Sequence, residues 1–296
     1  MDDDLPAFAV SLHGDDVRYV RAGSGPVVVL IHGILGSRRS WARLVSLLER
    51  DFTVIAPDLF GDGDSARSGR DYTLGGHAGR LRDLLDALGI ERVTLVGHSL
   101  GGGVAMQFAW LFPERCERLV LISSGGLGRE LALILRAPTL PGAGWVLPLI
   151  STPWLRWGGE RLARQLGRFG MRSSADLEEL WRGYVSLGDA EVRRAFLTTI
   201  RTVADLGGQS ISALERLPAL AHLPTLLVWG ARDRLIPVAH GVAGHQAIPG
   251  SRLEVFERAG HAPHLRDPRR FAGLLREFVA ATPTSAKLTS GPRTAT

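Results

Sequence analysis

The chain has 296 residues, of which 45% are hydrophobic and 22% charged, and its formal net charge is +5. This composition is typical of a soluble globular protein, either one large domain or a core with an insertion, and it excludes a disordered, collagen-like or coiled-coil chain. The charge excess is small and comes without a basic run, a zinc-finger spacing or an aromatic RNA-binding motif, so we expect no nucleic-acid partner.

The start of the chain does not resemble a secretory signal peptide. Met1 is followed by Asp2, Asp3 and Asp4, where a signal peptide is basic, and no apolar segment comes next. No stretch approaches the roughly 20 apolar residues that cross a bilayer. Cys116 is the only cysteine, which excludes an intrachain disulfide and argues against a cysteine-based metal site. We therefore expect a cytoplasmic protein with no metal and no other cofactor.

Short apolar runs alternate with segments of helical periodicity along the chain. The predicted strands are 7–12, 17–21, 27–31, 53–56, 93–96, 119–122, 226–229 and 253–256, and the predicted helices are 40–48, 81–88, 104–111 and 268–279. A continuous apolar run is typical of a strand that is buried on both faces. The alternation therefore predicts an α/β protein with a mostly parallel sheet between helices, after an opening hairpin.

The alternation stops near Gly125 and resumes after an insertion. Residues 126–214 show no buried-strand pattern and combine four prolines with helix-like patches. We predict a helical cap there, inserted after the sixth strand into a core formed by 1–125 and 215–281. The last residues, 282–296, are rich in threonine, serine, proline and glycine and are expected to form a disordered tail.

The most specific motif is Gly-His-Ser-Leu-Gly at 97–101, between the predicted strand 93–96 and a helix expected from Gly103. A serine at such a turn has a strained backbone and exposes its hydroxyl at the carboxyl end of the sheet. Glycines two residues before and after it allow strand and helix to approach closely, and the helix directs its positive end at the reacting centre. The motif predicts Ser99 as a nucleophile, with His98 beside it in the substrate site rather than in catalysis.

A second glycine-containing loop, His-Gly-Ile-Leu-Gly at 32–36, ends the predicted strand 27–31. Acyl transfer passes through an oxyanion that needs N–H donors, each worth on the order of 10²–10³ in rate. We expect the two donors to be the backbone amides of Leu100 and Ile34. His32 is expected to form hydrogen bonds within its own loop.

A nucleophilic serine needs a base, and the base needs an orienting carboxylate. Asp233 and His261 each follow a predicted strand, so both emerge at the same edge of the sheet as the serine. We assign Asp233 as the acid and His261 as the base. His264 is the alternative base, whereas His240 and His245 are expected on the surface of a helix. The alternative acids are Asp205, Glu254, Glu257 and Asp267.

With these motifs in this order, the chain resembles the α/β-hydrolases of the capped type that includes esterases, lipases and meta-cleavage product hydrolases. The segments that carry the resemblance are 32–37, 57–65, 97–102, 229–233, 236–237 and 260–261. The resemblance covers nearly the whole core and implies the α/β-hydrolase fold. It also implies that Ser99, Asp233 and His261 occupy the family's triad positions, which follow this chain order. Asp58, in the loop 57–65, is expected to have a structural role.

The type of nucleophile narrows the reaction. Similar folds that open epoxides or displace halide use an aspartate at this turn, whereas a serine favours acyl transfer to water. We therefore predict a serine hydrolase that cleaves a carboxylic ester, or a similar acyl bond, of a hydrophobic small molecule through an acyl-enzyme. Two alternatives stay open: a carbon–carbon bond hydrolase of the meta-cleavage type, whose oxyanion loop usually has more glycines, and a ligand receptor that retains the triad.

The cap segment is rich in aromatic residues. Trp145, Trp154 and Trp157 are predicted to line a hydrophobic substrate pocket above a polar catalytic floor. Packing of these side chains between cap and core explains them equally well.

Arginine is the dominant basic residue, because Lys287 is the only lysine. We attribute this bias to a GC-rich genome, with selection by an anionic partner as the alternative. Eleven arginines stand against eight acidic residues in 126–205. Arg164, Arg168 and Arg172 would share one helical face, which we expect to be solvated rather than bound to a membrane surface.

Overall fold

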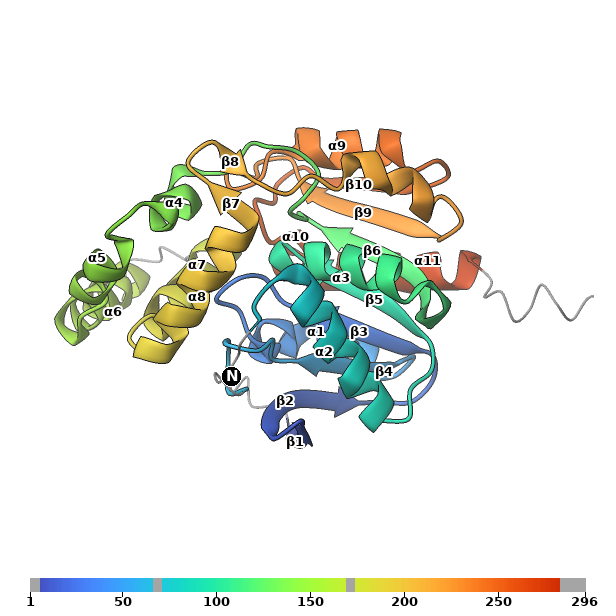
Figure 1. Cartoon of the computed structure of the whole chain (residues 1–296), viewed down its shortest axis with the longest axis horizontal. Coiled ribbons are helices and arrows are strands. Elements are labelled where there is room, and N and C mark those ends of the chain that lie inside the picture. The colour runs from blue at the N-terminus through green and yellow to red at the C-terminus, as the bar shows by residue number, and fades with distance from the viewer. Residues whose placement is uncertain (1–5, 66–70, 169–173, 283–296) are drawn as a thin grey trace, which may run out of the picture.

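An eight-stranded sheet lies at the centre of the molecule, with the strand order β1-β2-β4-β3-β5-β6-β9-β10 (Figure 1). The structure is a computed structural model and describes residues 6–65, 71–168 and 174–282. The strands are β1 (Ala7–Leu12), β2 (Asp15–Ala22), β3 (Val27–Ile31), β4 (Thr53–Pro57), β5 (Val93–His98), β6 (Cys116–Ile122), β9 (Thr225–Gly230) and β10 (Arg252–Phe256). β1 and β2 form an antiparallel hairpin, β2 is antiparallel to β4, and the other neighbours are parallel. The predicted mostly parallel sheet and its opening hairpin are confirmed.

Helices cover both faces of the sheet. They are α1 (Ala42–Leu48), α2 (Leu74–Ala87), α3 (Leu100–Leu111), α9 (Val238–Ala247) and α11 (Pro268–Ala281). In β3, Val28 and Leu30 belong to the apolar cluster under α1 and α11, whereas Val29 and Ile31 belong to the cluster under α2 and α3. Successive side chains of a strand point to opposite faces, so a strand between two helical layers needs apolar residues at every position.

Two helices begin earlier than the sequence pattern predicts. The predicted helix 81–88 is α2, which begins at Leu74 because the Thr73 side chain caps it by accepting a hydrogen bond from the Gly76 amide at 3.1 Å. Glycines in its first turns hide the apolar periodicity. The helix expected from Gly103 is α3, which begins at Leu100, directly after the serine turn.

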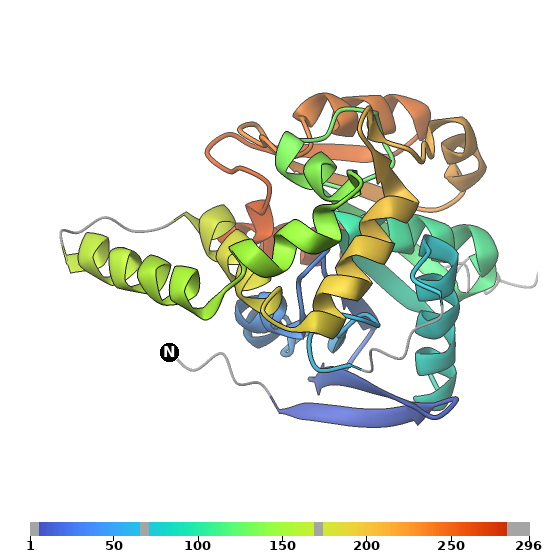
Figure 2. The ribbon, with the colours of Figure 1, turned by 60° about the vertical axis from the view of Figure 1, so that its left-hand side comes forward.

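The chain segment that connects β6 to β9 forms a group of helices, which lies beyond one end of the sheet (Figures 1 and 2). Its elements are α4 (Leu133–Arg136), η3 (Ala137–Thr139), α5 (Ala143–Ile150), α6 (Pro153–Arg168), α7 (Ala175–Ser186), α8 (Ala190–Val203), the short strands β7 (Ala204–Asp205) and β8 (Gly208–Gln209), and η4 (Leu214–Leu220). We call the helices α4 to α8 the cap. The predicted domain limits, at 125/126, 214/215 and 281/282, stay predictions.

The end of the described chain is attached to the core. The Arg118 side chain donates from Nε to the Thr282 hydroxyl at 2.7 Å. The rest of the predicted tail, 283–296, lies outside the described residues. In the part of the chain that the structure describes, no helix combines the length and the apolar character needed to span a membrane.

The loop after β4 is organised around the buried carboxylate of Asp58, which is 1% exposed. Its Oδ1 accepts a hydrogen bond from the Arg38 amide at 2.6 Å, and its Oδ2 accepts from the Arg38 guanidinium and, at 2.8 Å, from the Asp64 amide. The Arg38 side chain is also nearly buried, at 8% exposed. The contacts of Asp58 are those of a structural residue.

Replacing Asp58 with alanine should lower the free energy of unfolding by about 3–5 kcal/mol, because it leaves a buried guanidinium without its main counter-charge. Urea unfolding followed by circular dichroism measures the loss. Asp16→Ala is the matched control, since Asp16 is exposed and a surface change of this kind stays within about 0.5 kcal/mol. An equal, small effect of both substitutions would contradict the structural role of Asp58.

Candidate active site

Ser99 occupies a sharp turn between β5 and α3. Its φ of 54° and ψ of −116° lie outside the regions that L-residues normally adopt, a conformation that costs about 1–3 kcal/mol. The turn is held by hydrogen bonds on both sides of the residue. The Ser99 amide donates to the Ile122 carbonyl, and the Ser99 carbonyl accepts from the amides of Gly102 and Gly125, all at 3.0 Å. The structure therefore contains the strained turn that the motif predicts.

The glycines of the motif are required by close backbone contacts. A Cβ atom at Gly97 would collide with the carbonyl of Gly101, and one at Gly101 would collide with the carbonyls of Ile31 and His32. Neither obstacle is a flexible side chain that could move aside. Any larger residue at either position would push strand and helix apart and displace the serine.

The loop after β3 passes directly beside the serine. A Cβ atom at Gly33 would lie 3.1 Å from the Ser99 Cβ. His32 fixes this loop, because its Nε2 accepts from the Leu59 amide at 2.9 Å and its Nδ1 donates to the Gly33 carbonyl at 2.7 Å. Burial lowers the pKa of His32, so the ring stays neutral and keeps these two opposite roles. One of the two bonds is internal to its loop, and the other reaches the loop after β4.

Asp233 and His261 form a hydrogen-bonded pair at the carboxyl ends of β9 and β10. Their Oδ2 and Nδ1 atoms are 2.9 Å apart, and the other Asp233 oxygen, Oδ1, accepts from the amides of Leu235 at 2.9 Å and Ile236 at 3.0 Å. Burial raises the pKa of Asp233, but the hydrogen bond and charge of His261 and the two amides outweigh it and hold the pKa below its usual value. The carboxylate is thus ionised and accepts the hydrogen bond from His261 Nδ1, which leaves the imidazole Nε2 on the other side of the ring.

This shift links the stability of the fold to pH. Because the folded-state pKa of Asp233 is depressed, the resulting stability is present above the unfolded value of about 3.9. It is lost as the pH falls through the folded value. We expect the difference in unfolding free energy between the wild type and Asp233→Asn to shrink from about pH 5 to pH 3. Urea titrations at both pH values measure it, and a difference independent of pH would contradict the expectation.

Two other histidines pack around this pair. His98 donates from Nε2 to the His261 carbonyl at 3.0 Å, and burial together with the nearby His261 lowers its pKa to about 3. The His264 ring is buried between Trp41 and His98, at centroid distances of 4.6 and 4.7 Å. His264 is therefore a packing residue behind the site, not a base within it, and His98 helps to position the loop that carries His261.

The other histidines and carboxylates that the sequence analysis considers lie outside the Asp233–His261 pair in the structure. The prediction that His240 lies on a helix surface is wrong, because it is 2% exposed and bonds the Glu130 carboxylate at 2.7 Å. His245 is exposed, as predicted. Glu254 pairs with Arg252 and Asp267 caps α11. Asp205 and Glu257 are both exposed.

This geometry agrees with the comparisons to known proteins. The model of the family described as alpha/beta hydrolase fold matches residues 26–268. The chain belongs to this family. An uncharacterised protein of Mycobacterium tuberculosis is 39% identical over 274 residues, which are 92% of this chain and 80% of that protein. A 2-hydroxy-6-oxo-6-(2'-aminophenyl)hexa-2,4-dienoic acid hydrolase of Metapseudomonas resinovorans is 28% identical over 92% of this chain and 90% of its own length.

Solved structures share the fold of this α/β-hydrolase. The esterase RhEst1 from Rhodococcus sp. ECU1013 is 25% identical, with a TM-score of 0.68 over 94% of this chain and 99% of that one. A meta-cleavage product hydrolase from Pseudomonas fluorescens IP01 is 24% identical, with a TM-score of 0.72 over 93% and 98% of the two chains. The latter likeness shows the fold alone.

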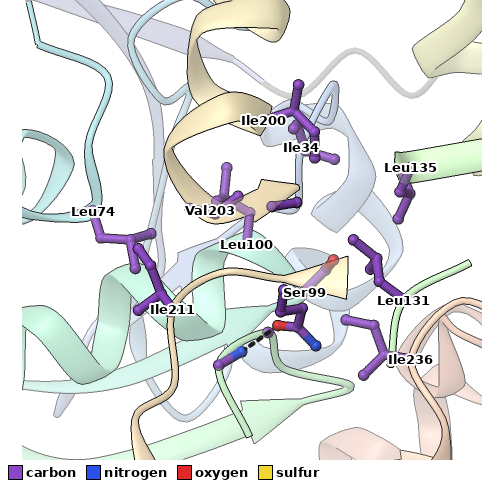
Figure 3. A pocket seen from close by; sticks show the side chains of 15 residues that line it. Ile34, Leu74, Ser99, Leu100, Leu131, Leu135, Ile200, Val203, Ile211 and Ile236 are labelled. Atoms are coloured by element: carbon purple, nitrogen blue, oxygen red, sulfur yellow. Dashed lines mark hydrogen bonds between the residues drawn. The ribbon is translucent and has the colours of Figure 1, made fainter. Parts of the chain in front are cut away.

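Two cavities meet at Ser99 in this hydrolase. The first, of about 60 Å³, is lined almost entirely by aliphatic side chains, and we call it the apolar cavity (Figure 3). Its labelled residues are Ile34, Leu74, Leu100, Leu131, Leu135, Ile200, Val203, Ile211 and Ile236. The second, of about 80 Å³, is lined by His98 and His261 and by Asp176 and Glu179 from α7, and we call it the histidine cavity. Ile34 and Leu100, the expected oxyanion donors, thus lie at the same cavity as Ser99.

The three cap tryptophans are not part of these cavities. Trp145, Trp154 and Trp157 are 84%, 80% and 53% exposed, and none is among the described residues that line either cavity. They sit on α5 and α6, and α5 packs against α8, where its buried Leu147 shares a cluster with Phe196 and Ile200. Their expected role as substrate-binding residues therefore finds no support in this geometry. Leu135, Ile200 and Val203 form the cap side of the apolar cavity instead, together with Leu131 just before α4.

One predicted feature of the cap cannot be placed. Arg172 and the side chains of Arg164 and Arg168 lie outside the described residues, although the α6 backbone is described as far as Arg168. Within the described ranges, no group of three or more histidine, cysteine, aspartate or glutamate side chains is arranged to hold a metal ion.

Proposed function

We propose that this protein hydrolyses carboxylic esters, or similar acyl bonds, of small hydrophobic molecules through an acyl-enzyme on Ser99. The observation that carries the proposal is the position of one serine between two cavities, of which only one is also lined by His261. Ser99 lines both, whereas His261, which Asp233 orients at 2.9 Å, lines the histidine cavity and not the apolar cavity.

The proposed mechanism begins when His261 Nε2 takes the Ser99 proton as the serine oxygen attacks the carbonyl carbon. The amides of Leu100 and Ile34 stabilise the oxyanion that forms. His261, charged at this stage and stabilised by Asp233, then gives its proton to the departing alcohol. Water enters the same position and repeats the two steps on the acyl-enzyme, which releases the acid.

The same mechanism assigns the two cavities. The leaving group receives its proton from His261, so it must lie in the histidine cavity. The acyl group then occupies the apolar cavity, where aliphatic side chains bury it. A volume of about 60 Å³ accommodates a short acyl chain, and longer chains require movement of the cap helices.

A panel of 4-nitrophenyl esters from acetate to dodecanoate tests this proposal. We expect kcat/KM to be highest for short chains of a few carbons and to fall as the chain outgrows the apolar cavity. Release of 4-nitrophenol measures the rates. An equal or rising kcat/KM up to dodecanoate would contradict the assignment of the apolar cavity.

A second candidate is carbon–carbon bond hydrolysis, which the relative from Metapseudomonas resinovorans favours because its name describes a dienoic acid hydrolase. The panel therefore includes a meta-cleavage product. Turnover of that compound alone would replace the ester assignment. Tight binding of such compounds without any turnover would instead support a ligand receptor.

A further inference from the structure

A third cavity, of about 540 Å³, is also lined by His261. Four arginines line it: Arg232, Arg234, Arg258 and Arg266. We call it the arginine vestibule. It shares the lining residues Asp176, Leu180, Leu235 and His261 with the histidine cavity, so the two cavities adjoin.

The fold brings the four arginines together through the segments that hold the catalytic pair. Arg232 and Arg234 flank Asp233 in the loop after β9. Arg258 follows β10, which is parallel to β9 and adjacent to it, so both loops leave the sheet at the same edge. Arg266 ends α10 (Pro263–Arg266), immediately after the loop of His261. The backbone positions of the four arginines are therefore fixed relative to the reacting centre.

The vestibule has an uncompensated positive charge. Within the described residues, no ion pair to an acidic side chain is formed by any of the four arginines, and all four are exposed. Other arginines of the core are paired, such as Arg38 with Asp58 and Arg276 with Asp51. The one carboxylate at the vestibule, Asp176, accepts a hydrogen bond from the Ala262 amide at 2.8 Å.

Four like charges around one cavity repel one another and create a field that attracts anions. Guanidinium groups also match the geometry of phosphate and carboxylate oxygens, to which they can donate two parallel hydrogen bonds. An oxyanion is thus the kind of ligand for which this cavity provides both charge and donors.

We propose that the arginine vestibule binds an oxyanion, a phosphate or a carboxylate, at the far end of the substrate's leaving group. The inference rests on the proposed function, because His261 places the leaving group in the adjoining histidine cavity. Ser99 lines that inner cavity but not the vestibule. The anionic group is therefore separated from the scissile bond by a neutral spacer of several atoms.

Three butanoate esters with one spacer and different distal groups test the proposal. Their alcohols are 1,5-pentanediol, 6-hydroxyhexanoate and 5-hydroxypentyl phosphate, so the spacer of five methylenes and the reacting bond are the same in all three. At low ionic strength we expect kcat/KM of at least one anionic ester to exceed that of the neutral ester at least tenfold. The anionic ester with the higher kcat/KM shows whether the site prefers a phosphate or a carboxylate. The preference should shrink in 0.5 M salt, which screens exposed charges.

The combined substitution Arg234→Ser, Arg258→Ser and Arg266→Ser should reduce the preference to less than threefold. Arg50→Ser is the control, because Arg50 is an exposed arginine after α1 and its loss should leave the preference intact. Equal kcat/KM for the three esters in the wild type would overturn the inference, and so would a preference that survives the triple substitution.

A separate readout distinguishes this inference from the proposed function. If the neutral ester is hydrolysed as fast as the anionic esters, the proposed function is supported and the oxyanion site is refuted. If no ester is hydrolysed, the function fails, and calorimetry with pentyl phosphate and pentanoate then tests the vestibule directly. The site is supported if the wild type binds either compound and the triple variant binds it at least tenfold more weakly. Equal binding by the two proteins, or no binding by the wild type, refutes it.

Discussion

Replacing Ser99 with alanine is expected to reduce ester turnover by about 10⁶-fold, which is the scale of loss when a triad serine is removed. The substitution deletes the attacking oxygen but keeps the Cβ atom, so the backbone contacts of the turn between β5 and α3 stay as they are. Circular dichroism and the thermal midpoint should therefore match the wild type. Release of 4-nitrophenol from a short-chain ester, followed at high enzyme concentration, measures the residual rate.

Ser123 provides a matched control for this experiment. It is also buried, has a positive φ of 43° and follows β6, the strand next to β5. Ser123→Ala should retain ester turnover, because Ser123 is not among the described residues that line either cavity at Ser99. Full turnover by Ser99→Ala would show that another group is the nucleophile.

Replacing Asp233 with asparagine should lower kcat by about 10⁴-fold, by analogy with other serine triads. The amide group of asparagine can donate a hydrogen bond to His261 Nδ1. Nδ1 must then accept, so the ring proton is on Nε2. The ring in that tautomer cannot take the proton of Ser99. Since the side chains have the same shape, KM for a short-chain ester should change little.

Asp205→Asn is the control for Asp233→Asn. Asp205 is one of the alternative acids in the sequence analysis, and it is exposed in β7. It should keep the wild-type kcat. A loss of less than tenfold in Asp233→Asn, or a larger loss in Asp205→Asn, would remove Asp233 from the proposed triad. Steady-state kinetics over pH 5 to 9 would also show whether the loss is independent of pH, as a wrong tautomer requires.

The sequence predicts the sheet and the serine turn well because their physical requirements are local. A strand such as β3 is buried on both faces and must be apolar throughout, and Gly97 and Gly101 face backbone atoms that leave no room for a side chain. The pairing of Asp233 and His261 is also predictable, because parallel strands bring their carboxyl ends to one edge. These features need no knowledge of how the cap folds.

The cap side of the site could not be predicted in the same way. Which face of a cap helix meets the core depends on packing between distant segments, so Val203 lies at the apolar cavity while Trp145 is exposed. The Asp176 side chain contacts the Ala262 amide across the cap–core boundary, and no local pattern signals such a contact. The same holds for His240, which is bonded to Glu130 in a different segment.

Five of the seven tryptophans of the chain fall into two groups that spectroscopy can separate. Trp41 and Trp229 are completely buried in the core, whereas Trp145, Trp154 and Trp157 of the cap are largely exposed. A collisional quencher such as iodide reaches exposed indoles far more readily than buried ones, so most of the quenchable intrinsic fluorescence comes from the cap. The protein thus carries its own optical probe of cap movement, with no attached label.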